Sequence, residues 1–404
     1  MDMLKSESPF YPGRPVPVEY FVGRKPEIER IVTRGVRQVS SGKPISIFVE
    51  GEYGIGKSSV AKYVQTLAEK EFGLHGIYAV LGGSSNLDDV AAAVLDGTVR
   101  SGAFDPRRLE VIRNWLARYI GKQETFGFSL NFDVLKSDAA LLAKPFGMLG
   151  FLEEAYGRLK DTGAKGIFLI MDEINGITSN PQFSYFIKSL IDSNAVARKS
   201  LPLLLMLCGV RQRRYEMIRC HQPVDRIFDV VEISVLTEAE MREFFQRSFA
   251  TAQMTMNDDA LDVLTDYSAG FPKMMQIIGD ATYWTDKDGV VDKADALRAV
   301  VTAAEEIGRK YVDEQVYEAL RSKDYRSILA KIGEMGPNSM SFLRSDIASG
   351  LTSSEQKKLT SFLQKMKSLH VLRSGDLRGE YVFNMRMVRL YIWLRSLRKE
   401  DETR

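Results

Sequence analysis

The stretch that decides the fold is Ile45-Ser46-Ile47-Phe48-Val49-Glu50-Gly51-Glu52-Tyr53-Gly54-Ile55-Gly56-Lys57-Ser58-Ser59. It opens with an apolar, β-branched run, which is typical of a buried strand. The run leads into Gly51-x-x-x-x-Gly56-Lys57-Ser58, the complete phosphate-loop pattern. Residues 60–64 then predict a helix whose positive N-terminal end faces the anion. A glycine-rich turn can match this pattern by chance, but a strand before it and a helix after it favour phosphate binding.

The loop residues suit a bound nucleotide. Glycines let the backbone fold tightly, so that successive N–H groups point into one concavity. We expect Lys57 to reach the outer phosphates of ATP and Ser58 to ligate Mg²⁺. The predicted nucleotide-binding residues of the loop are Gly51, Glu52, Tyr53, Gly54, Ile55, Gly56, Lys57, Ser58 and Ser59.

A second motif lies about 115 residues downstream, at residues 166–173 (GIFLIMDE). Its apolar run predicts a central strand covered on both faces, and two carboxylates stand at the end where ligands bind in open α/β sheets. We expect Asp172 to hold Mg²⁺ through water and Glu173 to polarise the water that attacks the outer phosphate. Alone, this could be a strand that simply ends in acids, but its position after a phosphate loop favours catalysis.

Composition sets outer bounds. The chain of 404 residues allows two or three domains, and its 45% hydrophobic and 27% charged residues are those of an ordinary globular protein. The net charge is +2, so the average says little about partners. Cys208 and Cys220 cannot form a disulfide framework, and neither a secretory signal nor a membrane-spanning run is seen, so we expect a cytoplasmic protein. Scattered histidines suggest no metal site beyond Mg²⁺.

The segment before the loop adds a family resemblance. Residues 21–31 predict a helix start, in which Pro26 and Glu27 suit the first turn. Together with the phosphate loop, Phe21-Val22-Gly23-Arg24 resembles the opening motif of AAA+ ATPases of the initiator (origin-recognition-like) and archaeal-type branch. The resemblance implies that Val22, Gly23 and Arg24 lie against the adenine, and that Asp172-Glu173 is a Walker B motif with its hydrolytic glutamate. The alternative for Arg24 is a surface residue.

The resemblance also points to groups that respond to the γ-phosphate. Residues 203–209 predict a buried strand, but no Asn, Ser or Thr stands where relatives carry a sensor, and we expect Cys208 to be a core thiol. Arg226, which precedes a short strand, is the candidate arginine finger, because a planar guanidinium suits phosphate oxygens. Arg211, Arg213 and Arg214 are competitors, and a structural ion pair is the alternative for Arg226.

Amphipathic helices over residues 237–251 and 258–268 precede Gly270-Phe271-Pro272-Lys273. This turn resembles the start of the helical lid in initiator-like and STAND proteins. Lys273 stands where replication initiators carry a sensor arginine. Lysine can contact phosphate but lacks bidentate geometry, so lid-driven hydrolysis is in doubt.

The tail has a different pattern. Residues 325–332, 342–348 and about 353–368 predict three helices, and residues 371–383 predict two short strands around a turn. This order resembles a winged helix. Residues 356–404 hold 12 Lys or Arg and 5 Asp or Glu, which makes the tail basic. The resemblance and the charge favour DNA binding. The predicted contact residues are Lys357, Lys358, Lys365 and Lys367 on the recognition helix and Arg373 and Arg378 on the wing. The alternative is a protein-binding winged helix.

These observations predict an α/β P-loop NTPase with a parallel-sheet core, an α-helical lid and a C-terminal winged-helix domain. We place an extended segment at residues 1–20, the core at 21–236, the lid at 237–320 and the winged helix at 321–404. A strand or hairpin is expected over residues 125–134. The resemblance implies an ATP-hydrolysing, DNA-associated switch that self-associates, with ATP between core and lid. The alternative is a STAND-type signalling or defence ATPase that acts on a protein effector, and a metabolic kinase is a distant third.

Overall fold

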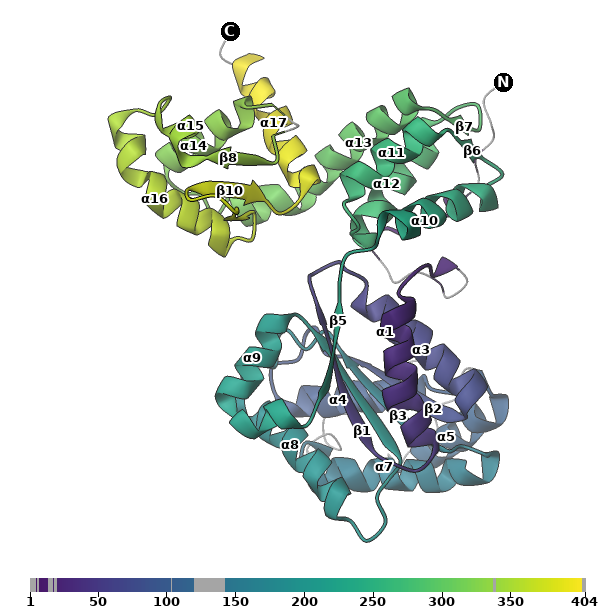
Figure 1. Cartoon of the computed structure of the whole chain (residues 1–404). Coiled ribbons are helices and arrows are strands. Elements are labelled where there is room, and N and C mark those ends of the chain that lie inside the picture. The colour runs from purple at the N-terminus through teal and green to yellow at the C-terminus, as the bar shows by residue number, and fades with distance from the viewer. Residues whose placement is uncertain are drawn as a thin grey trace. The chain divides into compact units, whose positions relative to one another are not determined.

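The chain forms two compact units (Figure 1). The computed structural model describes Lys5 and residues 7–13, 17, 20–102, 104–119, 142–336 and 339–401. One unit comprises Pro15–Ser234, and the other comprises Met1–Arg14 together with Val235–Arg404. The strand or hairpin predicted over residues 125–134 lies outside the described residues. The unit that contains both ends of the chain is therefore interrupted in sequence by the Pro15–Ser234 unit.

A five-stranded parallel sheet forms the centre of the Pro15–Ser234 unit. Its strands are β1 (Ile45–Gly51), β2 (Leu74–Val80), β3 (Gly166–Asp172), β4 (Leu203–Gly209) and β5 (Asp229–Ile233), in the order β2-β3-β4-β1-β5. All the strand pairs are parallel. Because parallel strands end at the same edge, the phosphate loop after β1 and the acids at the end of β3 lie at one edge of the sheet.

Helices cover both faces of this sheet (Figure 1). Several begin with the signals that the sequence carries: Asn86 caps α4 in a capping box with Asp89, and Pro181 stands in the first turn of α8. The helical elements of this unit are α1 (Lys25–Ile31), the π-helix η2 (Val32–Val36), α2 (Arg37–Ser40), α3 (Lys57–Phe72), α4 (Leu87–Val99), α5 (Pro106–Tyr119), α7 (Pro145–Leu159), η3 (Lys160–Thr162), α8 (Pro181–Val196), α9 (Arg211–Cys220) and η4 (Gln222–Arg226).

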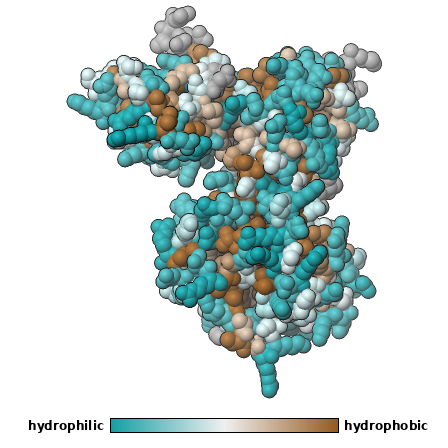
Figure 2. Space-filling view, viewed as in Figure 1, coloured by the Kyte–Doolittle hydropathy of each residue, from teal (hydrophilic) through white to brown (hydrophobic). Residues whose placement is uncertain are grey.

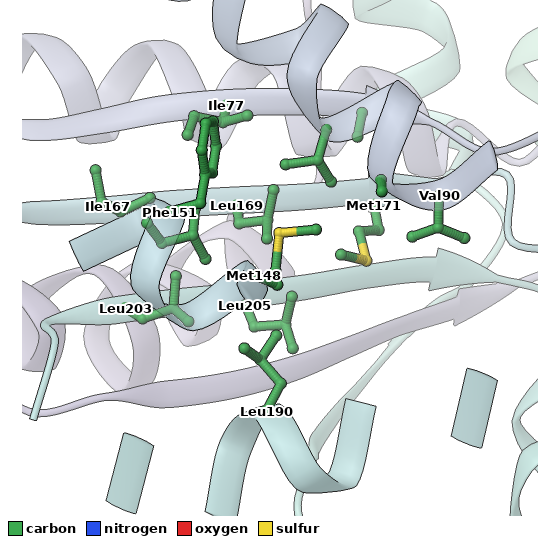
Figure 3. Packing of buried hydrophobic residues seen from close by; sticks show 14 of the residues in the cluster. Ile77, Val90, Met148, Phe151, Ile167, Leu169, Met171, Leu190, Leu203 and Leu205 are labelled. Carbon is green, nitrogen blue, oxygen red and sulfur yellow. The ribbon is translucent and has the colours of Figure 1, made fainter. Parts of the chain in front are cut away.

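The main core lies between one sheet face and helices α4, α5, α7, α8 and α9. Alternate strand residues such as Ile167, Leu169 and Met171 point toward it, where Met148 and Phe151 of α7 pack against them (Figure 3). The neighbours of these strand residues face the opposite side, where a Cβ at Gly35 of η2 would lie 2.7 Å from Ile47 and 3.1 Å from Leu204. The continuous apolar strands are thus buried on both faces, as predicted.

A helical array begins the Val235–Arg404 part of the other unit. Thr237 caps its first helix in a capping box with Glu240. The elements are α10 (Glu238–Thr251), β6 (Thr255–Met256), α11 (Asp258–Ser268), α12 (Pro272–Thr285), β7 (Val290–Val291), α13 (Lys293–Ile307) and the π-helix η5 (Gly308–Tyr317). The two short strands pair in parallel. The predicted helices at residues 237–251 and 258–268 are therefore present, with one cap residue of difference.

The N-terminal segment packs on this helical array. Phe10 is 4% exposed, and its ring lies 5.9 Å from that of Phe244 and 5.0 Å from that of Phe249. Gly279 of α12 faces the Phe10 ring at a position where a Cβ would collide with it. The Lys5 ammonium pairs with Asp286 at 3.4 Å. Residues before the phosphate loop thus stabilise helices that lie more than 200 residues after them in the sequence.

The last part of this unit contains α14 (Lys323–Glu334), β8 (Ser341–Leu343), α15 (Arg344–Ala348), α16 (Ser353–Ser368), β9 (Leu372–Ser374), β10 (Glu380–Phe383) and α17 (Arg386–Asp401). The three strands form an antiparallel sheet in the order β8-β10-β9. The prediction of one helix over residues 342–348 was wrong at its start, because Phe342 pairs with Tyr381 as a strand. The helix predicted over about residues 353–368 is α16, and Thr352 is its N-cap.

Hydrophilic residues dominate the face shown in Figure 2, and hydrophobic residues appear there in small patches. Among the residues described, no helix combines the length and the apolar composition needed to cross a lipid bilayer.

Candidate nucleotide-binding site

The phosphate loop joins β1 to α3, as the sequence predicts. Neighbouring atoms lie so close to Gly51 that a side chain would not fit there. A Cβ would lie 2.7 Å from the Ile233 carbonyl oxygen and 2.9 Å from Ile55. Gly54 and Gly56 have φ values of 77° and 97°, a region that side chains with a Cβ rarely adopt. The glycines of the motif therefore shape the loop for steric reasons that can be identified.

Lys57 lies across the loop that it follows. Its ammonium donates hydrogen bonds to the carbonyl oxygens of Gly51 at 3.0 Å and Glu52 at 2.8 Å. Burial lowers the pKa of Lys57, and the carboxylates of Asp172, Glu52 and Glu173 act in the opposite direction. The cation is thus held at the loop, in the field of the acids that end β3.

The remaining loop residues divide by exposure. Ile55 is buried and anchors the loop in the core, whereas Glu52 and Tyr53 are exposed, the latter by 65%. Ser58 and Ser59 lie in the first turn of α3, where the helix presents N–H groups without intrahelical partners. The predicted loop residues are thus together at one end of α3, a site suited to phosphate.

Asp172 ends β3 and is 3% exposed. Its Oδ2 accepts a hydrogen bond from the Tyr78 hydroxyl at 2.5 Å, and its Oδ1 accepts one from the backbone N–H of Glu173 at 2.8 Å. The Ser58 hydroxyl lies near this phenol and acts to lower its pKa. Asp172 and Ser58, which belong to two motifs far apart in sequence, therefore lie beside the same phenol.

These contacts fit a magnesium site. The hydroxyl of Ser58 and the carboxylate of Asp172 are hard oxygen donors of the kind that Mg²⁺ prefers, and both keep lone pairs free. No group of three or more His, Cys, Asp or Glu side chains able to hold a metal occurs among the described residues. A nucleotide-bound Mg²⁺ usually takes one or two protein ligands and the rest from phosphates and water.

Glu173 has an unusual backbone. Its φ is 56°, in the left-handed region that costs free energy for a residue with a side chain. The exposed carboxyl reaches the loop after β2, where a Cβ at Gly82 would collide with it. The backbone bend and the glycine together direct this carboxyl away from the core.

Arg24 is not a surface residue. It is 4% exposed, and its guanidinium donates to the carbonyl oxygen of Ile55 at 3.0 Å and to that of Ser234. Val22 and Gly23 precede it, and Gly23 has a φ of 76°. The segment that the sequence assigns to the adenine is therefore tied to the phosphate loop, while its contact with adenine stays a prediction.

The candidate finger arginines differ in their partners. Arg211 and Arg214 pair with Glu50 at 2.9 Å and 2.7 Å, and Arg213 pairs with Glu216 at 2.8 Å. Arg226, at the end of η4, is exposed, and no side-chain partner contacts it within the described residues. Of the four, Arg226 is the one whose guanidinium remains available.

Cys208 and Lys273 are the two remaining residues that the sequence singled out. Cys208 is fully buried, and its pKa is raised by burial and then by Asp172. Lys273 lies half-buried in the first turn of α12, in the unit that does not contain the loop. Its predicted phosphate contact stays a prediction.

The chain resembles two solved structures over nearly its whole length. One is a Walker-type ATPase of Pyrococcus abyssi, with a TM-score of 0.54 and 16% identity over 94% of this chain and 98% of that chain. The other is the ORC2 protein of Aeropyrum pernix in ADPNP and ADP complexes, with a TM-score of 0.60 and 11% identity over 97% of each chain. The chain shares the fold of these two proteins.

This shared fold confirms the predicted α/β fold of the P-loop NTPase type. The likeness is one of structure alone, because no protein-family model matches the sequence and no curated protein matches it. At 11% and 16% identity the likeness establishes the fold, and the chemistry has to be argued from the site itself.

Sequence reasoning missed two residues of this site. Tyr78 lies between Ser58 and Asp172, and Glu50 fixes two of the arginines. A polar residue inside the apolar run 45–51 was a signal for Glu50, because a buried carboxylate needs a partner. Tyr78 gave no comparable signal, since tyrosine is common in strands.

Proposed function

We propose that the protein binds and hydrolyses ATP and acts as a nucleotide-controlled switch. The observation that carries this proposal is the meeting of Lys57, Ser58, Asp172 and Glu173 at one sheet edge. The charges of both acids act on Lys57, Asp172 accepts a hydrogen bond from Tyr78, and Ser58 lies near the same phenol. A cation on a phosphate loop next to two carboxylates is the arrangement that phosphoryl transfer requires.

Each residue then has a defined task. The loop N–H groups and Lys57 bind the phosphates, while Ser58 and Asp172 hold Mg²⁺. The metal, when bound, neutralises charge on the phosphate oxygens. The exposed carboxyl of Glu173 orients the attacking water and accepts its proton. Val22, Gly23 and Arg24 border the nucleotide base, and Lys273 contacts phosphate from the lid.

Self-association completes the site in this proposal. Arg226 is exposed and unpaired within the described residues, so it can reach the γ-phosphate held by a neighbouring copy. Because an arginine finger stabilises charge in the transition state, hydrolysis would depend on assembly. ATP binding would in turn stabilise the assembly, which gives the switch its two states.

DNA is the proposed partner of the C-terminal domain, residues 321–404, which we assign as a winged helix. Lys357, Arg373 and Arg378 are exposed and Lys365 is half-buried on α16 and the β9–β10 hairpin, and none of the four has an ion-pair partner in the described part of the chain. Unpaired cations on a helix and an adjacent wing can neutralise phosphates on one duplex.

A protein effector is the second candidate partner, and three features favour it. Lys358 is already paired with Asp324 at 2.7 Å, and Lys367 lies over the Tyr381 ring at 5.2 Å, so both are less available to DNA. Leu377, at the hairpin tip, is 65% exposed. An exposed apolar residue beside Arg378 suits a protein surface of the STAND type.

ATP turnover of the full-length protein, measured with and without duplex DNA at low and moderate salt, tests the switch. DNA that stimulates turnover and binds less tightly at higher salt would support the first partner. Replacing Lys357, Lys365, Arg373 and Arg378 by Ala would then lower the salt slope by about 0.9 for each DNA phosphate that the protein no longer neutralises. Lys287→Ala/Lys293→Ala, exposed lysines outside this domain, is the matched control. Turnover that ignores DNA would favour a protein effector.

A further inference from the structure

Tyr78 occupies the place where the two magnesium candidates meet. It lies on β2, whose register with β3 sets Tyr78 beside Ile170 and Val80 beside Asp172. Its hydroxyl donates to Asp172 Oδ2 at 2.5 Å, and the Ser58 hydroxyl lies near enough to act on its pKa. One phenol therefore lies between the phosphate loop and the end of β3.

Further contacts hold this phenol in place. The Lys62 ammonium lies 5.3 Å from the centroid of the Tyr78 ring, one helical turn after Ser58 on α3. The Tyr78 hydroxyl is the donor in its 2.5 Å contact with Asp172 Oδ2. The ring and the hydroxyl are thus both fixed.

The bonds leave room for a metal. Asp172 Oδ2 accepts from Tyr78 and Oδ1 accepts from the Glu173 N–H, so the plane of the carboxylate is set while each oxygen keeps a lone pair. Ser58 can direct its proton to the phenol oxygen and keep its own lone pairs for the ion. This is the role of outer-shell groups that orient metal ligands.

We propose that Tyr78 is the positioning residue of the magnesium–ATP site, holding Ser58 and Asp172 in the orientation that the ion requires. This inference rests on the proposed function. It predicts that removal of the hydroxyl weakens the response to Mg²⁺ without weakening the contacts that the loop makes with ATP alone. A phenol that competed with the ion would produce the opposite change.

The experiment compares ATP binding by the wild type and Tyr78→Phe, measured by calorimetry in EDTA and across a series of Mg²⁺ concentrations. We expect the affinity for ATP in EDTA to stay within about twofold, and the Mg²⁺ concentration for half of its effect to rise about 10-fold or more. Tyr156→Phe is the matched control, because among the described residues its hydroxyl has one hydrogen-bond partner, the Lys165 carbonyl at 3.4 Å. Neither quantity should change in that variant.

A double variant keeps the test independent of folding effects. Because Tyr78 acts through Asp172 and Ser58, Tyr78→Phe should add little to the loss of Mg²⁺ response caused by Ser58→Ala/Asp172→Asn. An unchanged or improved Mg²⁺ response in Tyr78→Phe, an equal loss of affinity with and without Mg²⁺, or full additivity would overturn the inference. Absence of ATP binding by the wild type would instead overturn the proposed function.

Discussion

Arg214 Nε lies 2.7 Å from a carboxylate oxygen of Glu50, the residue directly before the phosphate loop. Glu50 is 2% exposed, and its other oxygen accepts from Arg211 at 2.9 Å. Two arginines at the start of α9 are therefore fixed to the end of β1. This ion-paired group ties α9 to the strand that carries the loop.

Replacing Glu50 should destabilise the protein strongly. In Glu50→Ala, Arg214, whose side chain is 14% exposed, would lose its buried partner and keep the more exposed Asp225 at 3.2 Å. Breaking a buried pair costs about 3–5 kcal/mol in the free energy of unfolding, so we expect a loss of about 3 kcal/mol. Glu232→Ala is the control, since Glu232 pairs with Arg211 at 2.6 Å but is 58% exposed, and its loss should cost about 1 kcal/mol or less. Urea denaturation measures both values, and equal costs would contradict the buried-pair account.

Phe10→Ala should lower the free energy of unfolding by about 3–4 kcal/mol, because a buried ring leaves a cavity among Phe244, Phe245 and Phe249. Gly279→Ala should also destabilise, since its new Cβ would meet the Phe10 ring. Thermal unfolding of the two single variants and the double variant measures their coupling. The two changes should be clearly less than additive, because the smaller side chain at residue 10 makes room for the new methyl group. Full additivity would show that the N-terminal segment does not pack on α12.

Acid should destabilise the protein through His75. Its ring is 1% exposed, Nε2 lies 2.7 Å from the Ser101 hydroxyl oxygen, and burial lowers its pKa to about 3. The unfolded chain takes up this proton below about pH 6.5, whereas the folded chain does not until about pH 3. The free energy of unfolding should therefore fall by about 1.4 kcal/mol per pH unit within that window from this group.

The measurement is the slope of the free energy of unfolding against pH in the wild type and in His75→Gln. Glu69, whose pKa is raised by burial to about 7, acts in the opposite direction, so the difference between the two proteins isolates His75. His75→Gln should lose the acid-dependent decline that His75 causes, while His370→Gln, at an exposed position, should keep it. Equal slopes in all three proteins would mean that His75 is protonated when folded.

Arg226→Ala should lower ATP turnover by about 1,000-fold, as expected for an arginine finger, while leaving affinity for ATP within about twofold. Turnover per wild-type subunit should rise with protein concentration, because the finger comes from a neighbouring copy. Arg219→Ala, another exposed arginine nearby, is the control. Unchanged ATP turnover in Arg226→Ala would show that Arg226 is not the arginine finger.

The local motifs could be predicted from sequence because their signals are short. Gly51-x-x-x-x-Gly56-Lys57-Ser58 combines a strand, a turn and a helix start, and the run ending at Asp172 has the apolar pattern of a central strand. The starts of α4 and α10 are likewise set locally, because the side chains of Asn86 and Thr237 cap these helices.

Contacts between residues far apart in the sequence could not be predicted, because the tertiary fold creates them. The contact of Phe10 with α10 spans more than 200 residues, and the pairing of Glu50 with Arg214 spans 164. The Ser341–Leu343 strand was missed because three residues carry too little periodicity and gain their structure from β10. Tyr78 shows the same limit, since the pairing of β2 with β3 sets it opposite Ile170, from where its hydroxyl reaches Asp172 two residues further along β3.

The most direct test of the central claim is ATP hydrolysis and ATP binding by the wild type, Lys57→Ala and Glu173→Gln, measured on the same preparations with Mg²⁺. The account predicts that the wild type binds and hydrolyses ATP and that Lys57→Ala does neither. Glu173→Gln should bind ATP with wild-type affinity but lose turnover, because the amide cannot accept a proton from water. Normal hydrolysis by Glu173→Gln would contradict the assignment of the base, and absence of ATP binding by the wild type would contradict the account as a whole.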